Sequence, residues 1–214
     1  MTTQERIAEI LLNVGAVTLN VAEPFTYSSG MRSPIYCDNR LLISHPQERQ
    51  EVIQAFLEVL EKEGVDADVI AGTATAGIPH AAWIAQALDK PMIYIRDKAK
   101  GHGKGNQIEG LVSEGASAVI IEDLISTGGS SIRAAIAARE AGFIVSDIVA
   151  IFTYEFEAGL RAFADEHVRV HTLSNFSTLI HVAKAKGALT DEEVEKALEW
   201  NADPAGWGKK MGLK

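Results

Sequence analysis

Two adjacent carboxylates stand before a run of glycines and hydroxyls near the middle of the chain. Glu122 and Asp123 follow four apolar residues, 118–121, which are typical of a buried parallel strand. Ser-Thr-Gly-Gly-Ser-Ser then occupies 126–131, and an alanine-rich helix is expected over 132–141. A glycine-rich helix N-terminus binds phosphate, whereas ionised carboxylates only accept hydrogen bonds and suit ribose hydroxyls. This order of residues predicts a site for a sugar with a 5-phosphate and free 2- and 3-hydroxyls. The hydroxyls of Ser126, Thr127, Ser130 and Ser131 are expected to donate to the phosphate.

A second loop has the same composition further upstream. Gly-Thr-Ala-Thr-Ala-Gly spans 72–77, after an expected strand at 69–71 and before an expected helix at 79–88. Small residues between a strand and a helix often serve packing alone, but two such loops in one sheet suit a ligand with two anionic ends. The sequence therefore predicts a second anion site beside the first.

A polar segment, 96–110, follows the next expected strand and is rich in glycine and lysine. Its cations are notable because the net charge of the chain is −9. Such a segment is expected to move when empty and to close over an anion. A solvated lysine loop is the simpler interpretation of these charges. His102 lies between two glycines and is a poor core residue, so a histidine packed in the core is not expected here. The candidate residues are Arg96, Lys100 and His102.

Composition excludes several classes of protein. The 214 residues, 47% of them hydrophobic, suffice for one α/β domain with a sizeable core. No apolar run approaches the roughly 20 residues of a membrane span, so no membrane partner is expected. The charge of −9 argues against nucleic-acid binding. A lone cysteine, Cys37, indicates a reducing, cytoplasmic setting.

The positioning elements follow from periodicity. We expect a single domain, 1–214, in three parts: N-terminal helices and a hood (1–64), an α/β core (65–175), and C-terminal helices with a tail (176–214). Thr2 with Glu5 predicts a capping box for the first helix, and Thr190 with Glu193 predicts one for the last. The first helix is expected to run to Val14 and to be followed by a hairpin-like hood at 16–43. Further helices are expected at 46–63, 79–88, 132–141, 176–186 and from 190. Strands are expected at 69–71, 91–95, 118–121, 144–153 and 168–172. No order is predicted for the tail from 201 onward.

With these segments in view, the chain resembles the orotate phosphoribosyltransferases, which are type I phosphoribosyltransferases. The resemblance spans nearly the whole chain. The motifs that carry it are Tyr-Ser-Ser-Gly-Met-Arg-Ser-Pro-Ile-Tyr at 27–36, Gly-Ile-Pro at 77–79, Arg96-x-x-x-Lys100-x-His102-Gly, and Glu-Asp-Leu-Ile-Ser-Thr-Gly-Gly-Ser at 122–130. It implies the type I fold, an α/β fold with a central, mostly parallel sheet flanked by helices and a small N-terminal hood.

The resemblance also implies an activity. The enzyme would transfer the phosphoribosyl group of 5-phosphoribosyl 1-diphosphate (PRPP) to N1 of orotate, giving orotidine 5′-monophosphate and pyrophosphate in pyrimidine (UMP) biosynthesis. Mg²⁺ would be required and held mainly through PRPP oxygens, with no direct protein ligand. A homodimer with active sites shared between subunits is implied, with Lys100 and His102 acting from the neighbouring subunit.

The site residues implied by the resemblance fall into three groups. The catalytic group is Lys100, His102, Glu122 and Asp123, with both carboxylates on the ribose hydroxyls. Orotate would contact Ser126. The PRPP-binding group is Arg96, Lys100, His102, Glu122, Asp123, Leu124, Ile125, Ser126, Thr127, Gly128, Gly129 and Ser130.

Some positions depart from one branch of that family. Ser28, Ala76 and Tyr154 stand where the branch has lysine, lysine and arginine, and Asp97 stands where it has a second basic residue. Arg32 or hood backbone N–H groups would then hold the orotate carboxylate. Two alternatives stay open: a purine phosphoribosyltransferase, and a PRPP-sensing regulator without catalysis.

Overall fold

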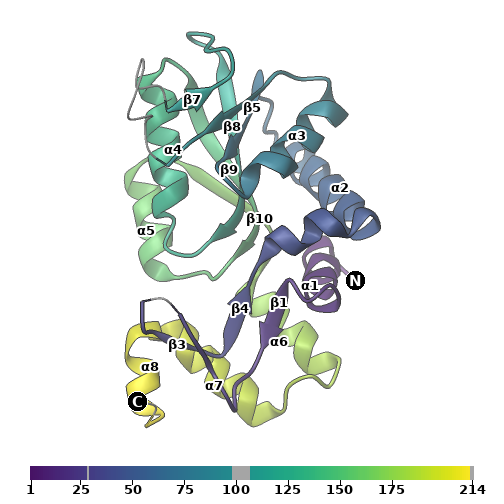
Figure 1. Cartoon of the computed structure of the whole chain (residues 1–214), viewed down its shortest axis with the longest axis vertical. Coiled ribbons are helices and arrows are strands. Elements are labelled where there is room, and N and C mark those ends of the chain that lie inside the picture. The colour runs from purple at the N-terminus through teal and green to yellow at the C-terminus, as the bar shows by residue number, and fades with distance from the viewer. Residues whose placement is uncertain (28, 98–106, 213–214) are drawn as a thin grey trace.

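A six-stranded sheet forms the centre of the molecule in this computed structural model, which describes residues 1–27, 29–97 and 107–212 (Figure 1). The strand order is β10-β9-β8-β5-β6-β7, and every pair is parallel except β6 with β7. The bounds are β5 Val69–Thr73, β6 Met92–Ile95, β7 Ile108–Glu109, β8 Ser117–Ile125, β9 Ile144–Thr153 and β10 Arg169–Asn175. The predicted α/β architecture with a mostly parallel sheet is therefore confirmed.

Helices cover both faces of this sheet. Helices α2 (Pro46–Lys62) and α3 (Gly77–Leu88) lie on one side, and α4 (Gly129–Glu140) and α5 (Glu157–Asp165) lie on the other (Figure 1). Alternate residues of each strand enter different cores, as the period-2 geometry of a strand requires. Along β8, Val119 and Ile121 join the core that contains Phe56 of α2, while Ile120 joins the core with Phe163 of α5.

Helix α1 (Thr3–Asn13) begins at the predicted capping box, in which Thr2 and Glu5 bond each other reciprocally. Its buried residues, Ile7 and Leu11 among them, join the core on the α2 side. Gly15 then takes a φ of 73°, a conformation that favours glycine and ends the helix.

The predicted hood consists of two small antiparallel pairs outside the main sheet. Strand β1 (Val17–Leu19) pairs with β4 (Ile35–Cys37), and β2 (Phe25–Thr26) pairs with β3 (Arg32–Ser33). A 3₁₀ helix, η1 (Asn39–Ser44), leads from β4 into α2. The hood is thereby placed beside the carboxyl end of β8, which η1 contacts.

Three C-terminal helices pack around the hood: α6 (Phe176–Ala185), α7 (Asp191–Ala202) and α8 (Pro204–Lys210) (Figure 1). The capping box at Thr190 is confirmed. The tail, for which no order was predicted, forms α8, because Asp203 caps it and Pro204 occupies its first turn. Indole Nε1 of Trp200 donates to the carbonyl of Arg32 at 3.1 Å and so ties α7 to β3.

Several predicted bounds were wrong. Strand β8 continues through the acid pair to Ile125, and α4 begins at Gly129 rather than at 132. The predicted elements did not include α5 or β7. Within the described ranges, no helix has the length and apolar character needed to cross a membrane.

Candidate active site

The two predicted anion loops, numbered here in chain order as the first (72–77) and the second (126–131), lie at one edge of the sheet. Strand β5 pairs in parallel with β8, with Gly72 opposite Ile121, and with β6, with Thr73 opposite Ile95. The carboxyl ends of parallel strands meet at the same edge. The loop after β5, the acid pair of β8 and Arg96 after β6 are therefore neighbours, as the sequence predicted.

Glu122 lies at the centre of this edge and is 5% exposed. Its carboxylate accepts hydrogen bonds from Oγ1 of Thr73 at 2.6 Å, Oγ of Ser131 at 2.8 Å and Oγ of Ser130 at 3.3 Å. A buried carboxylate is tolerated only with such donors. Glu122 therefore connects the end of β5 to the first turn of α4, and its predicted contact with ribose stays a prediction.

Asp123 is only partly buried, and its backbone carbonyl accepts a 2.6 Å hydrogen bond from Nδ2 of Asn39 in η1. Burial of the carboxyl group, followed by the charge of Glu122, raises the pKa of Asp123 to about 7. Two neighbouring carboxyl groups thus differ in character. Glu122 is fixed by donors, whereas Asp123 can exchange a proton near neutral pH.

The second anion loop ends at the N-terminus of α4. Gly128 is the N-cap, with a φ of 79° and no side-chain cap, so the first N–H groups of α4 are free to bind an anion. A methyl group on Gly128 would lie 2.5 Å from the ring of Phe163, which packs beneath the loop. Thr127 is exposed and Ser126 partly buried, in keeping with the predicted phosphate and orotate contacts.

Leu124 and Ile125 complete the predicted PRPP motif, but their side chains pack in the two cores. Their contribution to a ligand is therefore confined to backbone groups. Ser131 was also expected to supply a hydroxyl to the phosphate. That expectation was wrong, because Ser131 is fully buried and its Oγ bonds Glu122.

The first anion loop is held close to β8. A methyl group on Gly77 would lie 2.4 Å from the carbonyl oxygen of Ile121 and 2.6 Å from Oγ1 of Thr73, so only glycine fits there. The peptide bond between Ala74 and Thr75 is cis. Helix α3 begins directly at Gly77, which turns its first N–H groups toward the same edge.

Arg96 follows β6, and its Nη1 lies 3.3 Å from Oε1 of Glu109. Its backbone N–H donates to the carbonyl of Gln107, so the two ends of the basic segment are joined. Lys100 and His102, as well as Ser28 of the hood, lie outside the described residues.

Tyr154 takes part in an aromatic cluster between the core and the hood. Its hydroxyl lies 3.2 Å from that of Tyr27, which donates to the carbonyl of Ile35 at 2.7 Å. The ring stacks on Phe156 and meets Trp200 edge-on. Burial raises the pKa of the Tyr154 hydroxyl, which is therefore neutral. Tyr154 thus gives this position a neutral hydrogen-bonding group.

Arg32 was predicted to compensate for missing cations near the base. Its Nη1 donates to Oγ1 of Thr26 at 2.8 Å, while its Nε is buried and has no hydrogen-bond partner among the described residues. The stem of the side chain lies against Gly208 of α8. Arg32 therefore has an unused donor in the hood.

Two cavities adjoin the predicted site residues, and a larger one lies elsewhere on the molecule. One of about 20 Å³ lies between the two anion loops and includes Arg96 and Ser130 in its lining. Another of about 190 Å³ adjoins Ser126 and Glu155. The third, of about 570 Å³, lies between α1, α2 and β10, and no predicted site residue lines it.

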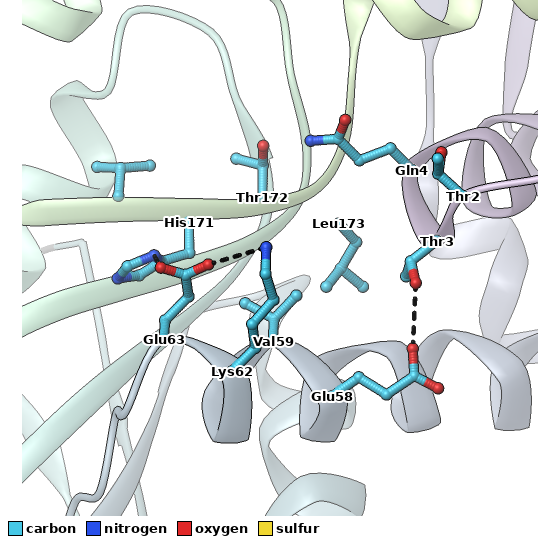
Figure 2. A pocket seen from close by; sticks show the side chains of 11 residues that line it. Thr2, Thr3, Gln4, Glu58, Val59, Lys62, Glu63, His171, Thr172 and Leu173 are labelled. Carbon is cyan, nitrogen blue, oxygen red and sulfur yellow. Dashed lines mark hydrogen bonds and ion pairs between the residues drawn. The ribbon is translucent and has the colours of Figure 1, made fainter.

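This third cavity has a mixed polar and apolar lining, in which polar side chains are paired with one another (Figure 2). Oγ1 of Thr3 donates to Glu58 at 3.2 Å, and Lys62 pairs with Glu63 at 3.3 Å. Arg6 pairs with Glu58 at 3.3 Å, so the carboxylates of Glu58 and Glu63 both have a cationic partner. We therefore keep the catalytic hypothesis at the two anion loops.

Sequence reasoning missed four contributions to the site. Asn39 bonds the backbone of Asp123, Thr73 and Ser131 bond Glu122, and Arg133 lines the small cavity between the loops. The run of hydroxyls in the motif contained Ser131, but nothing in its spacing says which hydroxyl turns inward. Thr73 and Asn39 are brought to β8 only by the fold, from 49 and 84 residues away.

Comparisons with known proteins agree with this geometry. Residues 41–149 match the family model for the phosphoribosyl transferase domain. The orotate phosphoribosyltransferase of Coxiella burnetii is 54% identical over 207 residues, covering 97% of this chain and 99% of that protein.

Two solved structures are also similar. The crystal structure of orotate phosphoribosyltransferase from Aeropyrum pernix has a TM-score of 0.74 at 29% identity and covers 86% of this chain and 99% of that one. Leishmania donovani UMP synthase has a TM-score of 0.77 at 28% identity and covers 92% of this chain and 42% of that one. The fold is thus that of a type I phosphoribosyltransferase.

Proposed function

The chain belongs to the orotate phosphoribosyltransferases, and from this membership we infer that it transfers the phosphoribosyl group of PRPP to orotate. The products are orotidine 5′-monophosphate and pyrophosphate, and the reaction belongs to pyrimidine biosynthesis. The observation that carries the conclusion is the near full-length match to orotate phosphoribosyltransferases. The position of the acid pair and both anion loops at one edge of the sheet supports it. The purine and regulatory alternatives lack this support.

We propose the following division of roles at that edge. The loop from Ser126 to Ser130 binds the 5-phosphate through free N–H groups and hydroxyls. Asp123 accepts hydrogen bonds from the ribose hydroxyls, while Glu122 places negative charge near the ribose. Arg96 binds pyrophosphate. The bond from C1 to the pyrophosphate oxygen breaks as the bond from C1 to N1 of orotate forms, and the N1 proton is released to water. Carboxylates beside the ribose stabilise the positive charge that develops at C1.

Lys100 and His102 are proposed to complete the leaving-group side from the neighbouring subunit of a homodimer. The test mixes two inactive variants, Lys100→Ala and Asp123→Ala. If the sites are shared, hybrid dimers contain one intact site, and the mixture regains about a quarter of the activity. If each subunit works alone, the mixture stays inactive.

For orotate, Ser126 and Arg32 are the proposed contacts. Arg32 has a donor without a partner in the described part of the hood, and a guanidinium suits a carboxylate. Replacing Arg32 with methionine is expected to raise KM for orotate and leave KM for PRPP unchanged. Equal rises in both constants would show that the substitution perturbs the hood as a whole.

Mg²⁺ is the proposed cofactor, held mainly by pyrophosphate and ribose oxygens. The partly exposed carboxylate of Asp123 can accept hydrogen bonds from ribose hydroxyls or from water on the ion, so an ion held by PRPP oxygens fits beside it without a direct protein ligand. When bound, the ion neutralises charge on the leaving group. We also propose a cytoplasmic location, in keeping with the lone Cys37.

The decisive experiment follows the loss of orotate absorbance with PRPP, with and without Mg²⁺. Turnover of orotate that stops on chelation of the metal is expected. Hypoxanthine replaces orotate as the matched control. Turnover of hypoxanthine without turnover of orotate would refute the assignment.

A further inference from the structure

Two arginines from different elements line the small cavity between the anion loops. Arg96 follows β6, and Arg133 lies one turn into α4. The lining also includes Thr73 and Ala74 from the first loop and Ser130 from the second. Asp97 also lines it, so two guanidinium groups and one carboxylate lie where the two loops meet.

Arg133 is held in place by Asp97, the residue after Arg96. Its Nε and Nη2 both donate to Oδ1 of Asp97, at 3.1 and 2.7 Å. The two side chains are about half exposed, 55% and 54%, so their attraction is weak and open to competition by another anion. The interaction orients the guanidinium without burying it.

The remaining donor of the guanidinium points along the phosphate loop. No hydrogen bond within the described part of the chain uses Nη1 of Arg133. That nitrogen lies 3.3 Å from the position a Cβ would take on Gly129, the first residue of α4. It is thus next to the N–H groups proposed to bind the 5-phosphate, and on the side of α4 that faces Arg96.

We propose that Arg133 is a further PRPP-binding residue that contacts the pyrophosphate from α4, and that Asp97 is a positioning residue that aims its guanidinium. The proposal rests on the proposed function, because it assumes that PRPP is the ligand. Ala76 gives the first loop no cation, and Asp97 adds none beside Arg96. Nη1 of Arg133 can donate a charge-assisted hydrogen bond to a phosphate oxygen, so Arg133 supplies from a helix the charge that these two positions lack.

The test compares Arg133→Ala with Arg161→Ala, a matched control on α5. Arg161 is an exposed helical arginine that also pairs with a carboxylate, that of Glu157, and lines none of the three cavities described above. In Arg133→Ala, KM for PRPP and the inhibition constant of pyrophosphate are expected to rise about tenfold, the loss of one charge-assisted hydrogen bond. KM for orotate stays unchanged, and Arg161→Ala behaves as the parent enzyme.

Asp97→Asn separates ligand binding from a purely structural role of the pair. Both hydrogen bonds end on Oδ1, which asparagine retains, while the negative charge is lost. KM for PRPP is therefore expected to stay the same or fall. An equal loss in Asp97→Asn and Arg133→Ala would show that the pair only ties the end of β6 to α4 and would overturn the proposal.

A parent-like KM for PRPP in Arg133→Ala would also overturn it. Binding of pyrophosphate, measured as a rise in the thermal midpoint, gives a second readout that needs no turnover. That rise is expected to shrink in Arg133→Ala and to persist in Arg133→Lys. Failure of the proposed function would instead appear as a parent enzyme that does not consume orotate.

Discussion

Replacing Ser131 with alanine tests the view that Glu122 is fixed by donors from two elements. Ser131 is fully buried, and its Oγ lies 2.8 Å from Oε2 of Glu122. A hydrogen bond to a charged group contributes about 1.5–3 kcal/mol, and the buried carboxylate finds no water in its place. The free energy of unfolding is therefore expected to fall by about 2 kcal/mol, which corresponds to a drop in Tm of about 4–8 °C for a chain of this size.

The loss would be measured by urea unfolding at pH 7.5, with the slope of the transition checked for constancy. Ser130→Ala is the matched control for stability. Ser130 is exposed and its contact with Glu122 is 3.3 Å long, so a loss of at most about 0.5 kcal/mol is expected.

A double-mutant cycle with Thr73→Val sharpens the result. Oγ1 of Thr73 lies 2.6 Å from the other oxygen of Glu122. Because both hydroxyls bond one carboxylate, the two losses are expected to be non-additive by more than about 0.5 kcal/mol. A loss in Ser131→Ala no larger than in Ser130→Ala, or strict additivity with Thr73→Val, would refute the reasoning.

His80→Leu is expected to raise the free energy of unfolding by about 1 kcal/mol at pH 7, since both ring nitrogens of this buried side chain have no partner among the described residues. Burial lowers the pKa of His80 from 6.5 to about 4, so the parent protein loses stability as pH falls from about 6.5 to 4. Urea unfolding of His80→Leu should show a smaller loss over this pH range. An identical dependence on pH in both proteins would contradict the assignment to His80. The pKa of Asp123 is raised from 3.8 to about 7, so its effect on stability runs the other way: the ligand-free protein loses stability as pH rises from about 4 to 7. Asp123→Asn should remove this dependence of the unfolding free energy on pH, as measured by urea unfolding. Gly128→Ala is expected to weaken phosphate binding, measured by the thermal midpoint during a phosphate titration, because the methyl group would meet Phe163 at 2.5 Å and the φ of 79° disfavours alanine. Adding Phe163→Leu to this variant should recover part of the binding. If it recovers none, the effect comes from the backbone φ alone.

The sequence predicted those features that depend on neighbouring residues. Both capping boxes were correct because their two partners are three residues apart. The strand at 144–153 was correct because a strand buried on both faces is apolar along most of its length. The two anion loops were found because glycine and hydroxyl residues gather at strand-to-helix turns.

The features that depend on distant partners could not be predicted. The apolar pattern of β8 stops at Ile121, yet the strand continues through Glu122, because Thr73 and Ser131 make burial of a carboxylate tolerable. The pairing of Asp97 with Arg133 joins positions 36 residues apart. Helix α8 was missed for another reason. Asp203 and Pro204 are typical of a helix N-terminus, but the glycines that follow them disfavour a helix, and so no helix was predicted there.

The contact between β3 and α7 has a consequence for how the chain is made. The hood leaves the ribosome well before Trp200, whose indole holds the hood backbone from 168 residues further along the chain. Domains generally fold from the N-terminus during synthesis. Here the hood backbone gains this contact only after α7 has been made, so the sheet is expected to form before the hood is fixed. A nascent chain stalled before α7 would then bind pyrophosphate and still be unable to bind orotate.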